Sequence, residues 1–261
     1  MPRIGLVLLA LLGLALATRR LAGERNLPPK ESSVAPVLVE LFTSEGCSSC
    51  PPADAFLQQL DTQPFPGAHL IVLSEHVDYW NHIGWTDPYS SGAYSQRQSA
   101  YGDRFRLDSV YTPQMVVDGT EEFAGNNSGE ARKVFHQAIA AEKISVRISG
   151  ATLQTGVLRA HVETGPFSAP ERQADVFFVV ALNHAESRVA RGENAGRLLT
   201  HVAVVRNLVK VGRMEFGKAF SQDVSLKLQP GVEARSLRVI AFVQEPGPGH
   251  VLGAALEKLT K

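Results

Sequence analysis

The sequence predicts an α/β domain followed by an all-β, sandwich-like domain. Up to about residue 143, short apolar runs alternate with stretches whose apolar residues recur at helical spacing, which favours buried strands with intervening helices. Beyond that point apolar residues recur at every second position and Gly, Pro and Asn separate the runs, which is typical of half-buried antiparallel strands. A chain of 261 residues is long enough for two domains. We expect them at 36–143 and 144–261.

The first domain is predicted to hold three buried strands and three helices. The expected strands are apolar runs bounded by polar turns, at Val37–Phe42, His69–Leu73 and Met115–Val117. The expected helices are Ala53–Leu60, Ser91–Phe105 and Ser128–Glu142. Asn127 or Ser128 can cap the last helix, because either side chain accepts a hydrogen bond from the first helical turn.

The second domain is predicted from strand-like segments that follow one another without a helical pattern. Two segments alternate apolar with polar residues, around Ile144–Ile148 and Leu158–Val162. Four longer runs follow, at Val176–Leu182, Val202–Val211, Val224–Leu228 and Leu237–Val243. Short strands at regular spacing between turn residues indicate a β-sandwich.

The N-terminus is typical of a secretory signal peptide. A basic residue precedes the apolar run Ile4–Ala17, which is shorter than the roughly 20 residues that cross a bilayer. The run ends in Ala15-Leu16-Ala17, a small-x-small cleavage pattern. We therefore expect a signal peptide at 1–21, a polar linker at 22–35, and a periplasmic or secreted protein with no membrane span after cleavage. Two arginines just beyond the run keep an uncleaved anchor as the alternative.

The composition excludes two classes of partner. The chain has 26 basic and 26 acidic residues, so neither a nucleic acid nor an anionic membrane surface is expected to bind it through charge. Its hydrophobic fraction of 44% is that of a packed globular protein.

Cys47 and Cys50 are the only cysteines of the chain, and they stand between the first predicted strand and the first predicted helix. A thiol at a helix N-terminus is stabilised as thiolate by unpaired N–H groups, and a second thiol one turn further can attack a mixed disulfide formed on the first. We expect Cys47, nearer the solvent, to attack and Cys50 to resolve. Half of a zinc site, or a structural disulfide closing a four-residue loop, are the alternatives.

Pro113 is the second feature that points to redox chemistry. A proline at the start of a buried strand cannot donate to the ladder, and a tight turn or a cis bond explains it best. In thioredoxin-like folds a cis-proline loop of this form faces the Cys-x-x-Cys pair, and the residue before the proline, here Thr112, offers its backbone to the substrate chain. An ordinary trans turn is the alternative.

Four segments resemble the secreted proteins grouped as domain of unknown function 1223. They are Glu40–Asp54, His76–Trp80, Tyr111–Gly119 and Arg191–Arg197. The resemblance covers most of the mature chain. It implies a thioredoxin-like fold for the first domain, followed by a β domain, and a redox site at the cysteines. It implies no substrate.

Glu40 is the polar residue in a predicted buried strand, where a carboxyl should have a raised pKa. In thioredoxin-like proteins a buried acid relays the proton that activates the second cysteine, and Glu40 is a candidate for this role. A water pocket or an edge position is the alternative.

A second group of polar residues is close enough in sequence to bind a metal: His76, Asp78, His82 and Asp87. A loop whose polar tips are solvated, beside packed aromatic residues, explains this group better. Arg191–Asn194 is predicted to make a structural or inter-domain contact.

The sequence therefore predicts a thiol–disulfide oxidoreductase with Cys47, Cys50, Thr112, Pro113 and Glu40 at its site. The expected partners are protein thiols or disulfides and an electron-relay partner, with no cofactor or metal. The alternative is a non-catalytic module for protein interaction whose cysteine pair senses redox state or holds a metal.

Overall fold

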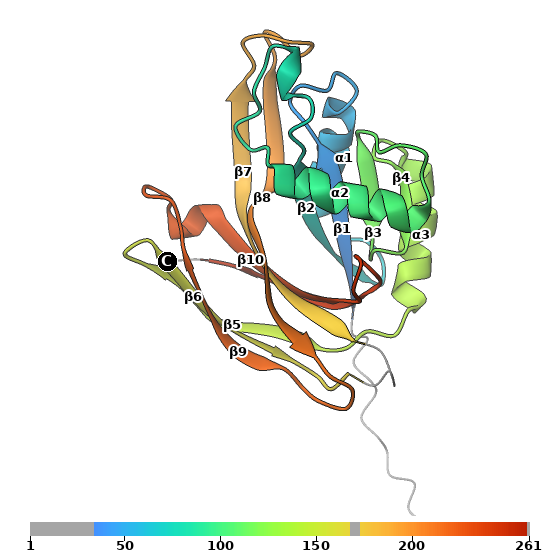
Figure 1. Ribbon diagram of the computed structural model, residues 1–261, viewed down its shortest axis with the longest axis vertical. Helices are drawn as coiled ribbons and strands as arrows, with labels where there is room; N and C mark the ends of the chain where they lie inside the picture. Colours follow the sequence, from blue (N-terminus) through green and yellow to red (C-terminus); the bar gives the residue numbers. More distant parts are fainter. Residues whose placement is uncertain (1–33, 168–172, 260–261) are drawn as a thin grey trace, which may run out of the picture. The chain divides into compact units, whose positions relative to one another are not determined.

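Eleven strands and three α-helices make up the part of the chain that the structure describes, which is residues 34–167 and 173–259 of a computed structural model (Figure 1). The helices are α1 (Pro51–Thr62), α2 (Gly92–Phe105) and α3 (Ser128–Ala140). The strands are β1 (Ala35–Thr43), β2 (Ala68–His76), β3 (Gln114–Val117), β4 (Glu121–Ala124), β5 (Val146–Gln154), β6 (Val157–Thr164), β7 (Ala174–Arg188), β8 (Leu198–Met214), β9 (Ser221–Lys227), β10 (Leu237–Gln244) and β11 (Val251–Lys258).

Strands from both predicted domains join in one mixed sheet. Its order is β11-β10-β7-β8-β2-β1-β3-β4, and β5, β6 and β9 form a second, three-stranded sheet. The predicted fold class, a thioredoxin-like α/β domain followed by a β-sandwich, is therefore wrong. The link is β8, which pairs with β7 along most of its length and meets β2 in parallel at Ser74 and Val204. Alternation along a strand predicts which face is buried, but it does not predict which sheet the strand joins.

The hydrophobic core also crosses the predicted boundary. Leu38 of β1 and Ile71 of β2 pack in one buried cluster with Val179 of β7, Val205 of β8 and Phe242 of β10. Burial of a shared apolar surface is the main favourable term in folding, so the two halves stabilise each other. The expected boundary near residue 143 falls in the link between α3 and β5, and it stays a prediction.

Helices cover the two faces of the β2-β1-β3-β4 part of the sheet. Successive residues of β1 point to opposite faces. Val39 and Leu41 pack with residues of α1 and α3 on one face, whereas Phe42 packs with Tyr101 of α2 on the other. Figure 1 shows α2 crossing this part of the sheet. Because β1 pairs with β2 in parallel and with β3 in antiparallel register, its C-terminal end at Thr43 lies among the loops that carry the predicted site.

The predicted elements of the first half are found with small changes at their ends. Ser91 caps α2 by accepting from the Ala93 N–H at 3.3 Å, and Asn127 caps α3 by accepting from the Glu130 N–H at 3.1 Å. Two strands were not predicted, β4 and β11.

The expected signal peptide and most of the expected linker lie outside the described residues. Within those residues, no helix is long and apolar enough to cross a membrane.

Candidate functional site

The cysteine motif forms a tight turn between β1 and α1. The Cys47 N–H donates to the Ser44 carbonyl at 3.1 Å, and the Cys50 N–H donates to the Cys47 carbonyl at 3.2 Å. Helix α1 begins at Pro51, so prolines occupy its first two positions, where the missing N–H groups would have no partner within the helix. Cys50 is the N-cap, three residues after Cys47. The motif thus stands at the positive end of the α1 dipole.

Cys47 and Cys50 form a disulfide, with their Cα atoms 5.4 Å apart. Both cysteines are fully buried, while Ser48 and Ser49 between them are exposed. The expectation that Cys47 lies nearer the solvent is therefore not met in this oxidised state. The turn directs the two serine residues outward and the sulfur atoms inward.

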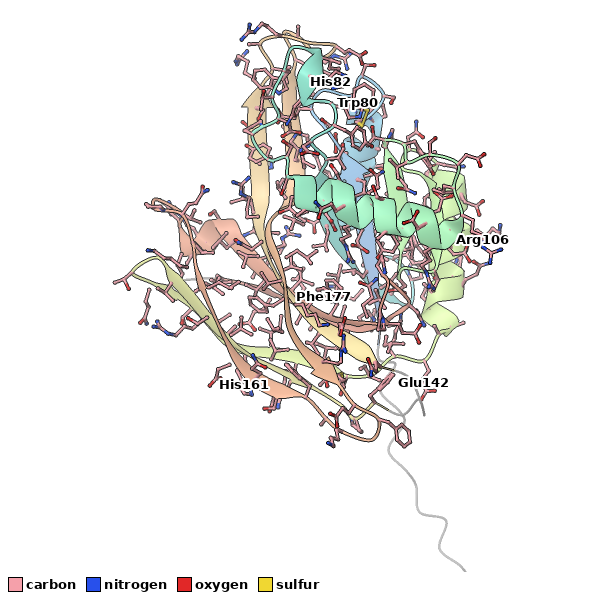
Figure 2. The ribbon with its side chains drawn as sticks, in the orientation of Figure 1. Trp80, His82, Arg106, Glu142, His161 and Phe177 are labelled. Carbon is pink, nitrogen blue, oxygen red and sulfur yellow. A yellow bond between two sulfur atoms is a disulfide. The ribbon has the colours of Figure 1, made fainter. Side chains whose placement is uncertain are left out.

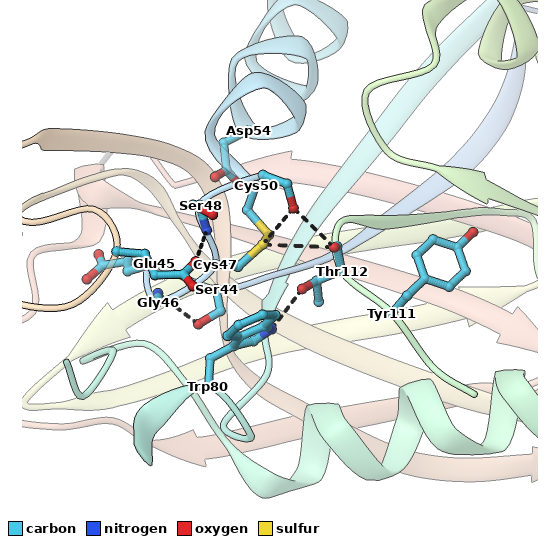
Figure 3. The surroundings of a disulfide bond; sticks show 12 residues. Ser44, Glu45, Gly46, Cys47, Ser48, Cys50, Asp54, Trp80, Tyr111 and Thr112 are labelled. Carbon is cyan, nitrogen blue, oxygen red and sulfur yellow. Dashed lines mark hydrogen bonds between the residues drawn. A yellow bond between two sulfur atoms is a disulfide. The ribbon is translucent and has the colours of Figure 1, made fainter. Parts of the chain in front are cut away.

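Thr112 and Pro113 lie beside the disulfide, and the peptide bond between them is cis, as predicted. The Thr112 carbonyl oxygen is 3.9 Å from Cys47 Sγ and accepts from Ser49 Oγ at 3.4 Å (Figure 3). Trp80 Nε1 donates to Thr112 Oγ1 at 2.8 Å. A Cβ placed on Gly46 would lie 3.0 Å from the Cβ of Trp80, so this indole side chain packs directly on the cysteine turn.

The turn between β7 and β8 holds the cysteine turn from another direction. Asn194 is fully buried, and its Nδ2 donates to the carbonyls of Glu45 and Cys47, each at 2.9 Å. Glu193 Oε2 accepts from the Ser48 N–H at 3.1 Å, and the Ser48 hydroxyl and this N–H together lower the pKa of the exposed carboxyl. The segment that was predicted to make a structural contact therefore contacts the candidate site itself.

A group of buried charged side chains lies on the α1 face of the sheet. His201 of β8 stands between two carboxylates, with Nε2 3.4 Å from Glu45 Oε1 and Nδ1 3.6 Å from Asp54 Oδ1. Burial alone lowers the pKa of His201, but Asp54 and Glu45 outweigh it and raise the pKa to about 10. Trp85 Nε1 donates to the other Glu45 oxygen at 2.7 Å.

His76 and Asp87 extend this group. His76 Nδ1 is 2.7 Å from Asp87 Oδ2, and the His76 ring meets the His201 ring edge-on with centroids 4.6 Å apart. Burial alone raises the pKa of Asp87, but His76 and the N–H groups of Glu45 and Tyr89 bring it below its usual value. The cluster therefore joins the loop before α1 to β2 and β8.

Glu40 lies on the opposite face of the sheet, under α2. Its carboxylate accepts from Arg97 Nε at 2.6 Å and from the Tyr101 hydroxyl at 2.5 Å. Burial, and then the charge of Glu40, raise the pKa of neighbouring Glu75 well above its usual value. Among the described residues, no hydrogen bond or ion pair joins Glu40 to Cys47 or Cys50. Its role as a proton relay stays a prediction.

Only two of the four residues considered for a metal, His76 and Asp87, come together. His76 pairs with Asp87, Asp78 accepts from Ser95 Oγ at 2.5 Å, and His82 lies on the surface. In the described parts of the chain, no three His, Cys, Asp or Glu side chains are arranged to hold a metal ion.

The sequence did not indicate a chemical role for three residues of the site, Asp54, Asn194 and His201. Asp54 and Asn194 both lie in segments that carry the family resemblance, which was the available signal for them. His201 has no such signal, because it reaches the site only through the pairing of β7 with β8 and the approach of β8 to β2.

Comparisons with known proteins agree with the resemblance and assign no activity. A family model described as "Protein of unknown function (DUF1223)" matches residues 38–244. A search of curated proteins found no match.

Two solved structures are similar to this chain over most of its length. A protein of Agrobacterium tumefaciens is 25% identical with a TM-score of 0.65, covering 84% of this chain and 92% of that one. HBP35 of Porphyromonas gingivalis is 17% identical with a TM-score of 0.65, covering 86% of this chain and 75% of that one. The second likeness concerns the fold alone.

Proposed function

The chain belongs to the DUF1223 family, whose function is unknown, and we propose from its site that it is a thiol–disulfide oxidoreductase. The observation that carries the proposal is the placement of its only two cysteines. They form a disulfide at the N-terminus of α1, with the Thr112 carbonyl 3.9 Å from Cys47 Sγ. A disulfide at the positive end of a helix is suited to exchange, because the helix dipole stabilises the thiolate that forms when the bond opens.

We propose that Cys47 forms the mixed disulfide with a partner and that Cys50 resolves it. Cys47 precedes the helix, whereas Cys50 is its N-cap and is held by the first turn through the Ala53 and Asp54 N–H groups, which donate to its carbonyl. The exposed serines at 48 and 49 mark the side from which a partner chain approaches. Because Cys47 is buried in the oxidised state, the packing around the turn must loosen before the partner's sulfur reaches it.

The proposed partners are protein thiols or disulfides and an electron-relay protein, and the proposed location is the periplasm or the cell exterior. An oxidising compartment is consistent with a chain that keeps two cysteines joined in one pair and has no others.

The test is the reduction of insulin by dithiothreitol, and the refolding of reduced ribonuclease, with and without the purified protein. Acceleration of either reaction, lost when Cys47 is replaced by alanine, supports the proposal. Ser48→Ala is the matched control, since it changes an exposed neighbour in the same turn and keeps both sulfur atoms. A wild-type protein that accelerates neither reaction refutes the proposal.

A redox-sensing interaction module is the second candidate, and the burial of both cysteines favours it. In such a module, opening of the disulfide would change the turn that Asn194 and Glu193 hold, and so change a surface that another protein binds. Stoichiometric binding of a partner to only one redox state, without turnover, would support this candidate over the enzyme.

A further inference from the structure

A cavity of about 560 Å³ lies between α2, strands β7 and β8, and the turn that joins β10 to β11. Small-molecule sites in proteins typically have about 300–1,000 Å³ and combine apolar walls with a few fixed polar groups. None of the residues that line the cavity belongs to the cysteine turn, to the Thr112–Pro113 loop or to the β7–β8 turn. The cavity is therefore separate from the candidate redox site.

Apolar side chains form much of the cavity wall. Phe177 of β7, labelled in Figure 2, is only partly buried, so part of its ring is open to the cavity. The same ring stacks on that of Phe242 in β10, with centroids 5.0 Å apart and planes 16° from parallel. Leu208 of β8 and two prolines of the β10–β11 turn, Pro246 and Pro248, add to the apolar part. A flat aromatic ring that enters the cavity can therefore stack against Phe177.

Arg97 of α2 brings a cation to the cavity wall, although its side chain is only 10% exposed. Its Nε donates to Glu40 at 2.6 Å, and its Nη2 donates to the Tyr101 hydroxyl at 3.2 Å and to Gln244 Oε1 at 3.0 Å. The remaining nitrogen, Nη1, forms no hydrogen bond with any described residue. More than nine in ten buried polar groups in proteins are hydrogen-bonded. An unpartnered N–H group on a nearly buried arginine beside a cavity indicates a ligand that accepts from it.

Three aromatic rings hold the guanidinium group of Arg97 in place. Its Cζ lies 5.2 Å from the ring centroid of Tyr101, 5.7 Å from that of Phe177 and 5.5 Å from that of Phe242. A cation at such distances from aromatic rings is attracted to them. The donor is therefore preorganised, and a ligand does not have to immobilise a flexible side chain.

Arg206 of β8 is a second cation that lines the cavity. Its Cζ lies 5.7 Å from the ring centroid of Tyr89, and its Nη1 donates to the Pro88 carbonyl at 3.4 Å. Within the described residues, no carboxylate forms an ion pair with Arg206. Ser91, the N-cap of the 14-residue helix α2, lines the same cavity, so the positive end of the helix dipole adds to the potential there.

The acidic groups near the cavity leave it with an excess of positive charge. Asp175, which lines the cavity, pairs through Oδ1 with Lys210 Nζ at 2.7 Å and with Arg213 Nε at 3.0 Å. Burial, and then the charge of Glu40, raise the pKa of Glu75 well above its usual value, which favours its neutral form. The basic groups are then Arg97, Arg206, Lys210 and Arg213, and the carboxylates are Glu40, Asp175 and Glu245. An anionic ligand is therefore favoured over a cationic one.

We propose that the cavity binds a small aromatic carboxylate. The carboxylate accepts from Arg97 Nη1, while Arg206 and the N-terminus of α2 favour its negative charge, and the aromatic ring lies against Phe177. Because Arg97 Cζ is only 5.7 Å from the centre of the Phe177 ring, a carboxylate attached directly to an aromatic ring spans both contacts. An uncharged aromatic ligand lacks the first contact, and a saturated acid lacks the second.

The test is a saturation-transfer NMR titration of the full, oxidised chain with naphthoate. Two further ligands separate the two contacts. Naphthamide has the same shape without the charge, and decahydronaphthoate has the charge without the aromatic rings. The titration does not depend on thiol–disulfide exchange, because the disulfide stays closed throughout.

Three variants place the ligand in the cavity. Arg97→Lys removes the Nη1 donor and keeps the charge, whereas Arg206→Gln removes a charge from a partly exposed side chain. Ala100→Phe fills part of the cavity from a partly buried position on α2. Arg147→Gln is the matched control, since it removes an exposed, paired arginine from the three-stranded sheet. Circular dichroism shows whether each variant is folded.

We expect naphthoate to bind the wild type with a Kd of about 1 mM or tighter, the range of small ligands in such cavities. Naphthamide should bind roughly tenfold more weakly because a charge-assisted hydrogen bond is lost, and decahydronaphthoate roughly threefold more weakly because it does not stack. For naphthoate, Arg97→Lys should weaken binding roughly tenfold and Arg206→Gln roughly threefold. Ala100→Phe should abolish saturable binding, and Arg147→Gln should leave it unchanged.

Absence of saturable naphthoate binding to the wild type would overturn the inference, and so would naphthamide that binds as tightly as naphthoate. Decahydronaphthoate that binds equally well would refute an aromatic ligand. Unchanged binding by a folded Ala100→Phe variant, or an equal loss in Arg147→Gln and Arg206→Gln, would refute the cavity as the site. Should Arg97→Lys or Ala100→Phe not fold, Arg206→Gln and the three ligands on the wild type carry the comparison.

Discussion

Replacing Asn194 by alanine should release the β7–β8 turn from the cysteine turn. Its Nδ2 donates at 2.9 Å to the carbonyls of Glu45 and Cys47, and the side chain is fully buried. Alanine removes both N–H donors, so the carbonyl oxygens of Glu45 and Cys47 remain buried without these hydrogen bonds. The variant therefore tests whether this turn holds the candidate site together.

The magnitude follows from the two hydrogen bonds. A buried acceptor left without its donor costs about 1–3 kcal/mol, and water that enters the space vacated by the amide offsets part of this. We expect the free energy of unfolding to fall by about 2–4 kcal/mol. With a urea dependence of about 3 kcal/mol per molar, the midpoint of unfolding should fall by about 1 M.

The assay is equilibrium unfolding of the oxidised protein in urea, followed by circular dichroism. Asn126→Ala is the matched control, because it makes the same substitution at an exposed asparagine before α3. In parallel, the reduced variant should react faster with iodoacetamide at Cys47, since the turn that holds its carbonyl is released.

Two outcomes would refute this reasoning. A loss of stability within about 0.5 kcal/mol, as surface substitutions give, would mean that the two hydrogen bonds contribute little. An unchanged alkylation rate of Cys47 together with a large loss of stability would mean that the β7–β8 turn does not control access to the sulfur.

Three further predictions concern the site. Cys50→Ala should accumulate disulfide-linked partners that disappear on reduction, seen on non-reducing gels, and Cys47→Ala should trap far fewer; equal trapping would reverse the assigned roles. If Glu40 relays a proton, Glu40→Ala should slow the release of a mixed disulfide more than its formation. Equal effects on both steps would mean that Glu40 has only a structural role. Because that change removes the carboxylate closest to the buried Arg97 and leaves only that of Glu75, 3.7 Å away, urea unfolding should also show a loss of about 3 kcal/mol. Since the pKa of His201 is raised from 6.5 to about 10 on folding, its contribution to stability is fully present below about pH 6.5 and is lost as the pH rises towards 10. His201→Gln should remove that part of the pH dependence, measured by urea unfolding across this range, and an unchanged slope would contradict the assignment.

Local patterns predicted the parts of the site that are close in sequence. The apolar run before Cys47 and the prolines after Cys50 predicted strand, turn and helix, because hydrophobic period and proline geometry act over a few residues. The cis bond before Pro113 was predicted from its position at the start of a buried strand together with the thioredoxin-like resemblance.

Glu40 shows where this local reasoning ends. The sequence indicated a buried acid in β1, and the structure buries it, but on the face that α2 covers. Neighbouring residues of a strand point to opposite faces, so a shift of one position separates a residue on the α1 face from one on the α2 face. The buried acid found on the α1 face after Cys50 is Asp54.

Residue type and short-range spacing were enough to predict a redox site, the family and the local elements. The folded chain adds two findings: one sheet joins both halves, and Asn194 and His201 contact the cysteine turn. These contacts depend on how β8 pairs with β7 and lies beside β2. Many strands share the same alternation of apolar and polar residues, and the choice of neighbour is made by packing of the whole core, which no short segment encodes.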